Sequence, residues 1–393
     1  MPARPVALLR SLALLAGLVL AACGGTPPQP ADPAALAIAP AGSGPPLVLG
    51  RMRTPAYARE RPQGDVAFVV DSGLGSVYEF DLRLRRFLGP APLLTGIGRM
   101  PAYPTVLGDF APQGAAVIDG ALYVADGDDG SVAHLAATPA GLGPAGYIQM
   151  PAFTLSLPPS EGGGVAPTAS RFLDLLAPLG DGAILVLGKD RVDGIGIAYA
   201  VDARDGTVTG TLQLPAGYPQ AAAHAAGRTV VAMDGKRLLV VAGQPLRIVE
   251  TIQLGGVPHG IAVVDRWAFV ALDSPARLVK VDLASGVAST VDSVAPSPGS
   301  SSISQQTGPV QTDGNVVWWT IKTGEIRQVS VLTGVHGRSF ETCRYVNGLA
   351  HAGAVLLATC LDHAQLALVD LRTGSVERTR AGYFPSAVVV AAS

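Results

Sequence analysis

Short apolar runs separated by polar turns dominate the chain, and residues 257–292 show this pattern most clearly. Asp, Ser, Pro and Gly separate the runs, and these residues favour tight turns. Runs of about five residues between such turns are typical of β-strands. The stretch therefore predicts a four-stranded antiparallel meander. Its strands are expected at His259–Val264, Trp267–Leu272, Leu278–Leu283 and Val287–Val291.

The third strand of this unit ends in Asp, and similar strands recur along the chain. In most copies a turn that contains Gly follows the strand. The copies are Val77–Leu82, Ala200–Ala203, Val279–Leu283 and Leu368–Leu371. A degenerate copy has Ser330 in place of Asp, and the spacing from Asp282 to Ser330 and on to Asp370 is 48 and then 40 residues. A single meander cannot bury both of its faces, so such repeats bury them by stacking on one another.

Two segments of the 257–292 unit carry a resemblance to a known repeat. Pro-His-Gly-Ile-Ala-Val at 258–263 and Val-Asp-Leu-Ala-Ser-Gly-Val at 281–287 resemble the YVTN/NHL-type β-propeller repeats of bacterial exported proteins. The resemblance covers residues 65–393 and implies an all-β propeller of four-stranded blades, most simply seven, with six and eight as alternatives.

The predicted blades follow one another along the chain, and the ring is closed by its last strand. Residues 386–392 are expected to complete blade 1 as its inner strand, which removes the free edges of the ring. The blades are expected at 65–88, 112–150, 171–214, 219–254, 257–292, 306–341 and 345–379.

The first residues read as a bacterial lipoprotein signal rather than as part of the fold. Arg4 and Arg10 form a basic region, Ser11–Leu20 is a short apolar segment, and Leu20-Ala21-Ala22-Cys23 resembles a lipobox. The resemblance implies a signal peptide at 1–22 and lipidation of Cys23; the alternative is a chance Cys after an apolar segment. A Gly/Pro/Ala-rich tether at 23–46 then leads to the propeller domain at 47–393.

This leader predicts a location in the cell envelope, lipid-anchored on the extracytoplasmic side. Gly24 after the Cys is compatible with outer-membrane sorting if the cell has two membranes. The formal net charge is −2, and 48 Gly and 32 Pro with 15% charged residues suit a turn-rich β protein. Because no concentrated basic face is indicated, nucleic acid is not expected as a partner, and the domain is expected to be a monomer.

Only Cys343 and Cys360 remain after Cys23. A pair of cysteines in an exported protein is a disulfide candidate. If a hairpin turns near Ala352-Gly353, the two residues lie almost opposite each other on neighbouring strands. A disulfide is therefore predicted, with two buried thiols as the alternative.

Polar residues are predicted to form a ring where the inner strands begin, at one mouth of the central channel. Alignment with His259 gives the residues Gln113, Gln220, His259, Thr307, Asn347 and Ser386. In blade 3 the corresponding residue is Leu173 or a neighbour. They are candidates for binding a ligand, although a solvated channel mouth also suits polar side chains. Three long connections, near 89–111, 144–170 and 293–306, are expected on the same face, where long loops often carry function.

Aromatic residues at this rim either stack on a ligand such as a sugar or fill the gaps between blades. They are Tyr103, Tyr147, Phe153, Tyr218, Tyr345 and Phe384.

No catalytic residues, metal ligands or cofactor are predicted. The six histidines lack zinc-ligand spacing, and the chain has no G-x-S-x-G elbow and no phosphate-binding glycine loop. Two functions remain open: a non-catalytic platform that binds an envelope protein or a glycan, and a propeller enzyme of lyase, lactonase or oxidoreductase type acting at the polar channel mouth. Fold alone does not decide between them.

Overall fold

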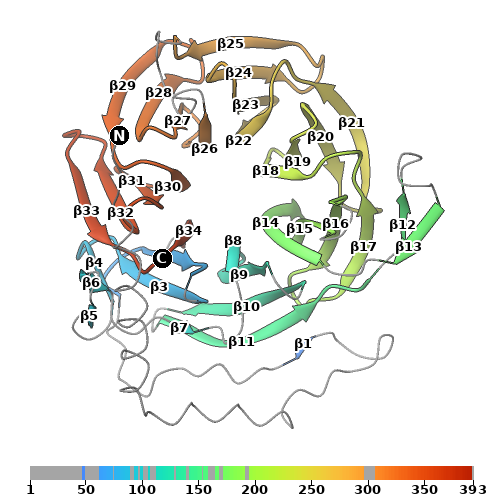
Figure 1. The fold of residues 1–393 in the computed structure, drawn as a ribbon, viewed down its shortest axis with the longest axis horizontal. Coiled ribbons are helices and arrows are strands. Elements are labelled where there is room, and N and C mark those ends of the chain that lie inside the picture. The colour runs from blue at the N-terminus through green and yellow to red at the C-terminus, as the bar shows by residue number, and fades with distance from the viewer. Residues whose placement is uncertain are drawn as a thin grey trace, which may run out of the picture. The chain divides into compact units, whose positions relative to one another are not determined.

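Seven four-stranded antiparallel sheets form a β-propeller in the computed structural model (Figure 1). Residues 47–48, 62–73, 75–88, 93–95, 98–100, 105–106, 112–127, 130–138, 141–152, 154–157, 164–167, 171–190, 194–295 and 306–391 are described. The predicted signal peptide, Cys23 and the tether to residue 46 lie outside them. None of the described residues forms a helix with the length and hydropathy needed to cross a membrane.

Each blade has an inner strand next to the channel and three further strands toward the rim. Blades 1 to 3 contain, in that order, β34 (Pro385–Ala391), β2 (Val66–Asp71), β3 (Ser76–Asp81) and β4 (Arg86–Phe87); β8 (Pro112–Ile118), β9 (Ala121–Asp126), β10 (Ser131–Thr138) and β11 (Gly141–Gln149); and β14 (Arg171–Gly180), β15 (Ala183–Asp190), β16 (Gly196–Asp202) and β17 (Val208–Gln213).

Blades 4 to 7 have the same order from channel to rim. They contain β18 (Pro219–Ala225), β19 (Arg228–Met233), β20 (Arg237–Ala242) and β21 (Arg247–Gln253); β22 (Pro258–Val264), β23 (Trp267–Leu272), β24 (Arg277–Asp282) and β25 (Ala288–Ser293); β26 (Thr307–Thr312), β27 (Val316–Ile321), β28 (Glu325–Ser330) and β29 (His336–Glu341); and β30 (Val346–Ala352), β31 (Val355–Cys360), β32 (Gln365–Asp370) and β33 (Val376–Arg380). The predicted blade boundaries agree with these strands.

The recurring Asp-to-Gly pattern forms the turn between the third and fourth strands. In blade 5, the Asp282 carboxylate accepts a hydrogen bond from the Ala284 amide, and the Gly286 amide donates to the Asp282 carbonyl. Gly286 has a φ of +69°, which glycine adopts without steric cost. The same turn occurs at Asp370 and Gly374, and Ser330 replaces Asp in blade 6.

The C-terminal strand closes the ring as predicted. β34 pairs with β2 along its length, from Val66 opposite Ala391 to Asp71 opposite Pro385. Across the same junction, the Arg85 guanidinium forms ion pairs with Asp370 and Glu377 of blade 7. The first and last parts of the chain thus stabilise each other.

Blade 1 has an unusually short fourth strand. β4 covers only the end of β3, and β7 (Thr105–Val106), from the long connection to blade 2, pairs with its beginning. Two hairpins lie in long connections: β5 (Leu93–Thr95) with β6 (Gly98–Met100), and β12 (Thr154–Leu157) with β13 (Gly164–Pro167). β1 (Leu47–Val48) adds a fifth strand to blade 2 by pairing with β11.

The hydrophobic core is divided into seven clusters, each packed between two adjacent blades. Trp318 and Trp319 show how one strand serves two clusters. They are consecutive in β27, so their side chains point to opposite faces of the sheet. Trp318 packs toward blade 7 and Trp319 toward blade 5, and both are fully buried.

The inner strands of blades 5 and 6 approach so closely that Gly260 leaves no room for a side chain. A Cβ at Gly260 would overlap the carbonyl oxygen of Gly308 in the next blade. We expect Gly260→Ala to lower the free energy of unfolding by about 1–3 kcal/mol, because the backbone must shift to relieve the overlap. Urea denaturation would measure this.

Gly337→Ala is the matched control. A Cβ there would lie 3.2 Å from the flexible Gln328 side chain on an exposed edge strand. Its stability should stay close to that of the wild type. Equal losses in the two variants would show that close packing of inner strands is not the cause.

Candidate functional site

Every inner strand has a β-bulge near its first residues. In blade 5, Pro258 lies opposite Leu272 and Gly260 opposite Ala271, which leaves His259 as an extra residue. Bulges of this kind re-aim a side chain and often occur beside functional sites. We call the seven bulge residues equivalent to His259 the mouth positions: Ser386, Gln113, Asp174, Gln220, His259, Gly308 and Asn347.

The structure places five of the six predicted ring residues at mouth positions; Thr307 is the exception. Thr307 lies opposite Ile321, as Pro258 lies opposite Leu272, so the mouth position of blade 6 is Gly308. In blade 3 the mouth position is Asp174, the neighbour of Leu173. A lone carboxylate within the apolar run 172–177 was the sequence signal for this residue.

The inner strands are more accessible to solvent than the strands behind them. In β18, six of seven residues are half-buried, whereas five of six residues in β19 are buried. Asn347 is exposed, and Gln113, Asp174, Gln220, His259 and Ser386 are half-buried. Solvent therefore reaches the mouth positions, although Oδ1 of Asp174 is enclosed.

His259 belongs to a hydrogen-bond network that joins blades 5 and 6. Its Nε2 lies 2.9 Å from Oδ2 of Asp273. The other oxygen of Asp273 accepts bonds from the Thr307 amide at 2.7 Å and the Thr307 hydroxyl at 2.9 Å. Burial alone would raise the pKa of Asp273, but the hydrogen bonds from His259 and Thr307 outweigh it, so that pKa is lowered. Thr307 is fully buried and holds the blades together.

Blade 3 carries an acidic and a basic residue in the reverse order at the same two places. Asp174 stands where blade 5 has His259, and Lys189 stands where it has Asp273. The Lys189 ammonium lies 4.5 Å from the ring centre of Tyr218 and 5.5 Å from that of Phe172. These are cation–π distances, so the ammonium is held at the junction of blades 3 and 4.

One oxygen of the Asp174 carboxyl group is not satisfied by the described part of the protein. Its Oδ1 is buried and has no hydrogen-bond partner there. Burial raises the pKa of Asp174 to about 7, and the nearby charge of Lys189 only partly offsets this effect. Leaving a buried polar group unpaired costs about 1–3 kcal/mol, and more when it is charged. Such a group is a common feature of binding and active sites.

The other histidines on inner strands have structural surroundings. His224 and His351 occupy equivalent positions further along their strands. His224 Nδ1 lies 2.8 Å from the Thr229 hydroxyl, and His351 stacks on Trp318 with ring centres 4.9 Å apart. Within the described ranges, no three His, Cys, Asp or Glu side chains gather closely enough to hold a metal ion.

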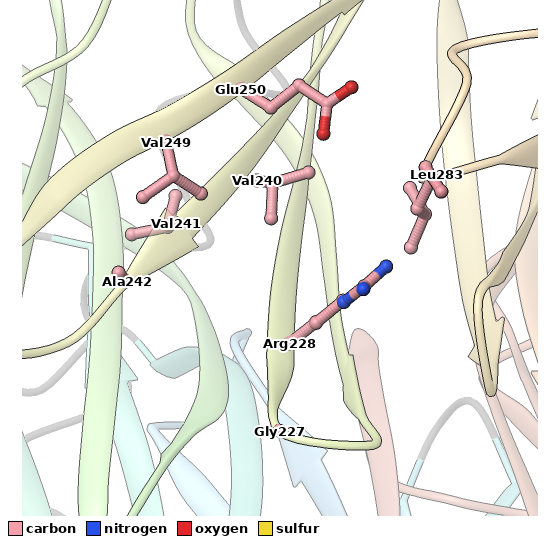
Figure 2. Close-up of a pocket in the computed structure, with 9 residues that line it drawn as sticks. Gly227, Arg228, Val240, Val241, Ala242, Val249, Glu250 and Leu283 are labelled. Carbon is pink, nitrogen blue, oxygen red and sulfur yellow. The ribbon is translucent and has the colours of Figure 1, made fainter.

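A groove of about 400 Å³ lies on the opposite face of the ring, between blades 4 and 5. Figure 2 shows Arg228 extending from β19 toward Leu283, with Glu250 on β21. Aliphatic side chains from rim strands and turns form most of the remaining lining. The channel mouth is the stronger candidate site, because it brings together polar side chains from six blades and an unsatisfied carboxyl group.

The seven sheets define the class of the protein as a β-propeller, and solved structures share this fold. A functionally unknown protein from Desulfotomaculum acetoxidans matches with a TM-score of 0.61 and 11% identity, over 84% of this chain and 99% of that one. The computationally designed Ika8 protein matches with a TM-score of 0.52 and 12% identity, over 85% and 95%. Citrobacter koseri AztD has a TM-score of 0.49 and 11% identity, over 84% and 98%.

No protein-family model matches the chain, and no curated protein matches it. At identities of 11–12%, the structural likeness concerns the fold alone. Function therefore has to be argued from the residues at the channel mouth.

Proposed function

We propose that this protein is a non-catalytic binding protein of the cell envelope, anchored by lipidated Cys23, that takes its ligand at the channel mouth. One observation carries the proposal: polar side chains of six blades occupy the equivalent bulge position at one end of the ring. A bulge on a paired strand holds its side chain on a rigid element, and binding sites benefit from such support.

The connections around the mouth support the same proposal. The long segments that follow β4, β11 and β25 each end at the start of the next inner strand, where the mouth positions lie. Two of them contain hairpins. Long connections on a rigid scaffold commonly supply binding surfaces, so a protein or glycan partner would meet both loops and mouth.

The anchor gives a direct prediction. Cys23→Ser should move the protein from the detergent-rich to the aqueous phase when cells are extracted with Triton X-114, because the acyl chains supply the membrane affinity. Thr26→Ala, three residues further along the tether, should remain in the detergent-rich phase. If Cys23→Ser also partitioned there, lipidation at this residue would be rejected.

Binding at the mouth is tested by affinity capture from solubilised envelopes of the native cell. Wild-type protein is expected to retain a reproducible protein or small molecule, identified by mass spectrometry. A Gln220→Ala/Asn347→Ala variant should lose it, because both side chains are at mouth positions. Glu250→Gln in the groove of the opposite face should retain it. Capture of nothing, or capture unaffected by the mouth variant, would contradict the proposal.

A further inference from the structure

The mouth position of blade 3 differs from the others in a way that points to the chemistry of a ligand. In blade 5, the mouth residue His259 already has its hydrogen-bond partner in Asp273. In blade 3, the residue in the place of Asp273 is Lys189, and its ammonium lies over aromatic rings instead of forming an ion pair with Asp174. Asp174 therefore keeps free hydrogen-bonding capacity.

The surroundings of Asp174 indicate an uncharged ligand. Lys189 places a positive charge close enough to affect the Asp174 carboxyl group, so the pair is nearly balanced in charge. When Asp174 is ionised, a charged ligand gains little net attraction from this pair, because attraction to one member is offset by repulsion from the other. A hydroxyl group carries no charge and donates to a carboxylate.

The neighbouring mouth residues extend this hydrogen-bonding surface. The backbone of blade 2 at Gly114 lies directly against the Asp174 carbonyl, which places Gln113 beside Asp174 in the ring. Gln220 follows in blade 4, whose inner strand packs against that of blade 3. Each glutamine amide both donates and accepts, so the three side chains suit a ligand with several hydroxyl groups.

Aromatic rings complete the set of groups. Phe172 is the second residue of the inner strand of blade 3, Tyr218 precedes that of blade 4, and Tyr383 and Phe384 precede that of blade 1. The last two are exposed, with 56% and 44% of their surface accessible. An exposed aromatic ring at a polar site provides a flat apolar surface on which a sugar ring can pack.

We propose that the channel mouth binds a neutral saccharide, with a sugar hydroxyl donating a hydrogen bond to the carboxyl group of Asp174 between Gln113 and Gln220. This inference rests on the proposed binding function and specifies its ligand class. The hydroxyl would bind Oδ2, the oxygen of this carboxyl group that is not enclosed, while Oδ1 stays buried.

Isothermal titration calorimetry at pH 8 with maltotriose, cellotriose and triacetylchitotriose tests the inference. The wild type is expected to bind at least one of them. Asp174→Asn, which keeps the size of the side chain, should weaken that binding about tenfold or more, because a hydrogen bond to a charged group is lost. Gln113→Ala should also weaken it.

Asp205→Asn is the matched control, since it makes the same substitution in the same blade, in an exposed turn on the opposite face. Its affinity should stay within about twofold of the wild-type value, well below the change expected for a lost charged hydrogen bond. Titration with each trisaccharide up to about 20 mM detects dissociation constants as weak as the millimolar range. If none of the three binds under these conditions, the saccharide inference is overturned. Equal affinity of Asp174→Asn and wild type would also overturn it.

These failures can be told apart from failure of the proposed function. If affinity capture still returns a molecule whose retention depends on Gln220 and Asn347, the mouth is a binding site for another ligand class. If capture also returns nothing, both proposals fail.

Discussion

The stability of Asp174→Asn relative to wild type is expected to be greater at pH 8 than at pH 4. The difference in free energy of unfolding between variant and wild type should rise by up to about 4 kcal/mol between these two pH values. The reason is the raised pKa, which moves from 3.8 to about 7 because the carboxyl group is buried. Each unit of difference between the folded and unfolded states is worth about 1.4 kcal/mol.

The pH window follows from this direction. Well below pH 4, Asp174 is protonated in both the folded and unfolded states, so it carries no penalty. Between pH 4 and pH 7 the unfolded state loses this proton while the folded state keeps it, so wild-type stability falls as pH rises. Above pH 7 the penalty is complete, and Asn avoids it because an amide does not ionise.

Urea denaturation at pH 4, 6 and 8 would measure the difference between variant and wild type. Asp205→Asn is the control, because the Thr207 amide lowers the pKa of that exposed carboxylate. This variant should not gain stability relative to wild type as pH rises. A pH-independent difference between Asp174→Asn and wild type would show that Asp174 titrates normally and is not enclosed as described.

Removing the disulfide should lower the free energy of unfolding by about 3 kcal/mol, since the bond closes a loop with a sequence separation of 17 residues. Cys343, before β30, is joined to Cys360, the last residue of β31, with their Cα atoms 5.8 Å apart. The predicted pairing is therefore confirmed. The bond fixes the entry to the inner strand of blade 7, close to Asn347.

A Cys343→Ala/Cys360→Ala variant tests this effect by urea denaturation without reductant. The wild type treated with dithiothreitol under unfolding conditions should lose a similar amount, whereas the variant should not respond to the reductant. Some additional loss is expected because both sulfur atoms are buried. Identical stabilities of oxidised wild type and variant would mean that the bond does not constrain the unfolded chain.

The sequence predicted the blades well because the information that defines them is local. Alternation within runs such as Trp267–Leu272 and turns such as that from Asp282 to Gly286 act over a few residues. A regular series of meanders, with one extra strand at the C-terminus, has few ways to bury its faces. For the same reason, the closure of blade 1 by the last strand followed from counting strands.

The candidate site was predicted only in part because it depends on register between strands that are distant in sequence. His259, Gln220 and Asn347 share a recognisable local pattern, so aligning them required no structure. Around Thr307 and Leu173 the local pattern is weaker, and a one-residue difference changes which side chain stands at the mouth. The pairing of β26 with β27 and of β14 with β15 settled these two positions.

By itself, the sequence determined the all-β class, the boundaries of seven blades, the strand that closes the ring and the disulfide, since alternation, turn chemistry and spacing act over short distances. Only the tertiary structure decided that Asp174 and Gly308 are mouth positions and that Asp174 and Lys189 stand in the places of His259 and Asp273, with the acidic and basic residues exchanged. The pKa of a carboxyl group depends on how far surrounding blades exclude water from it, and that exclusion exists only when the ring is assembled.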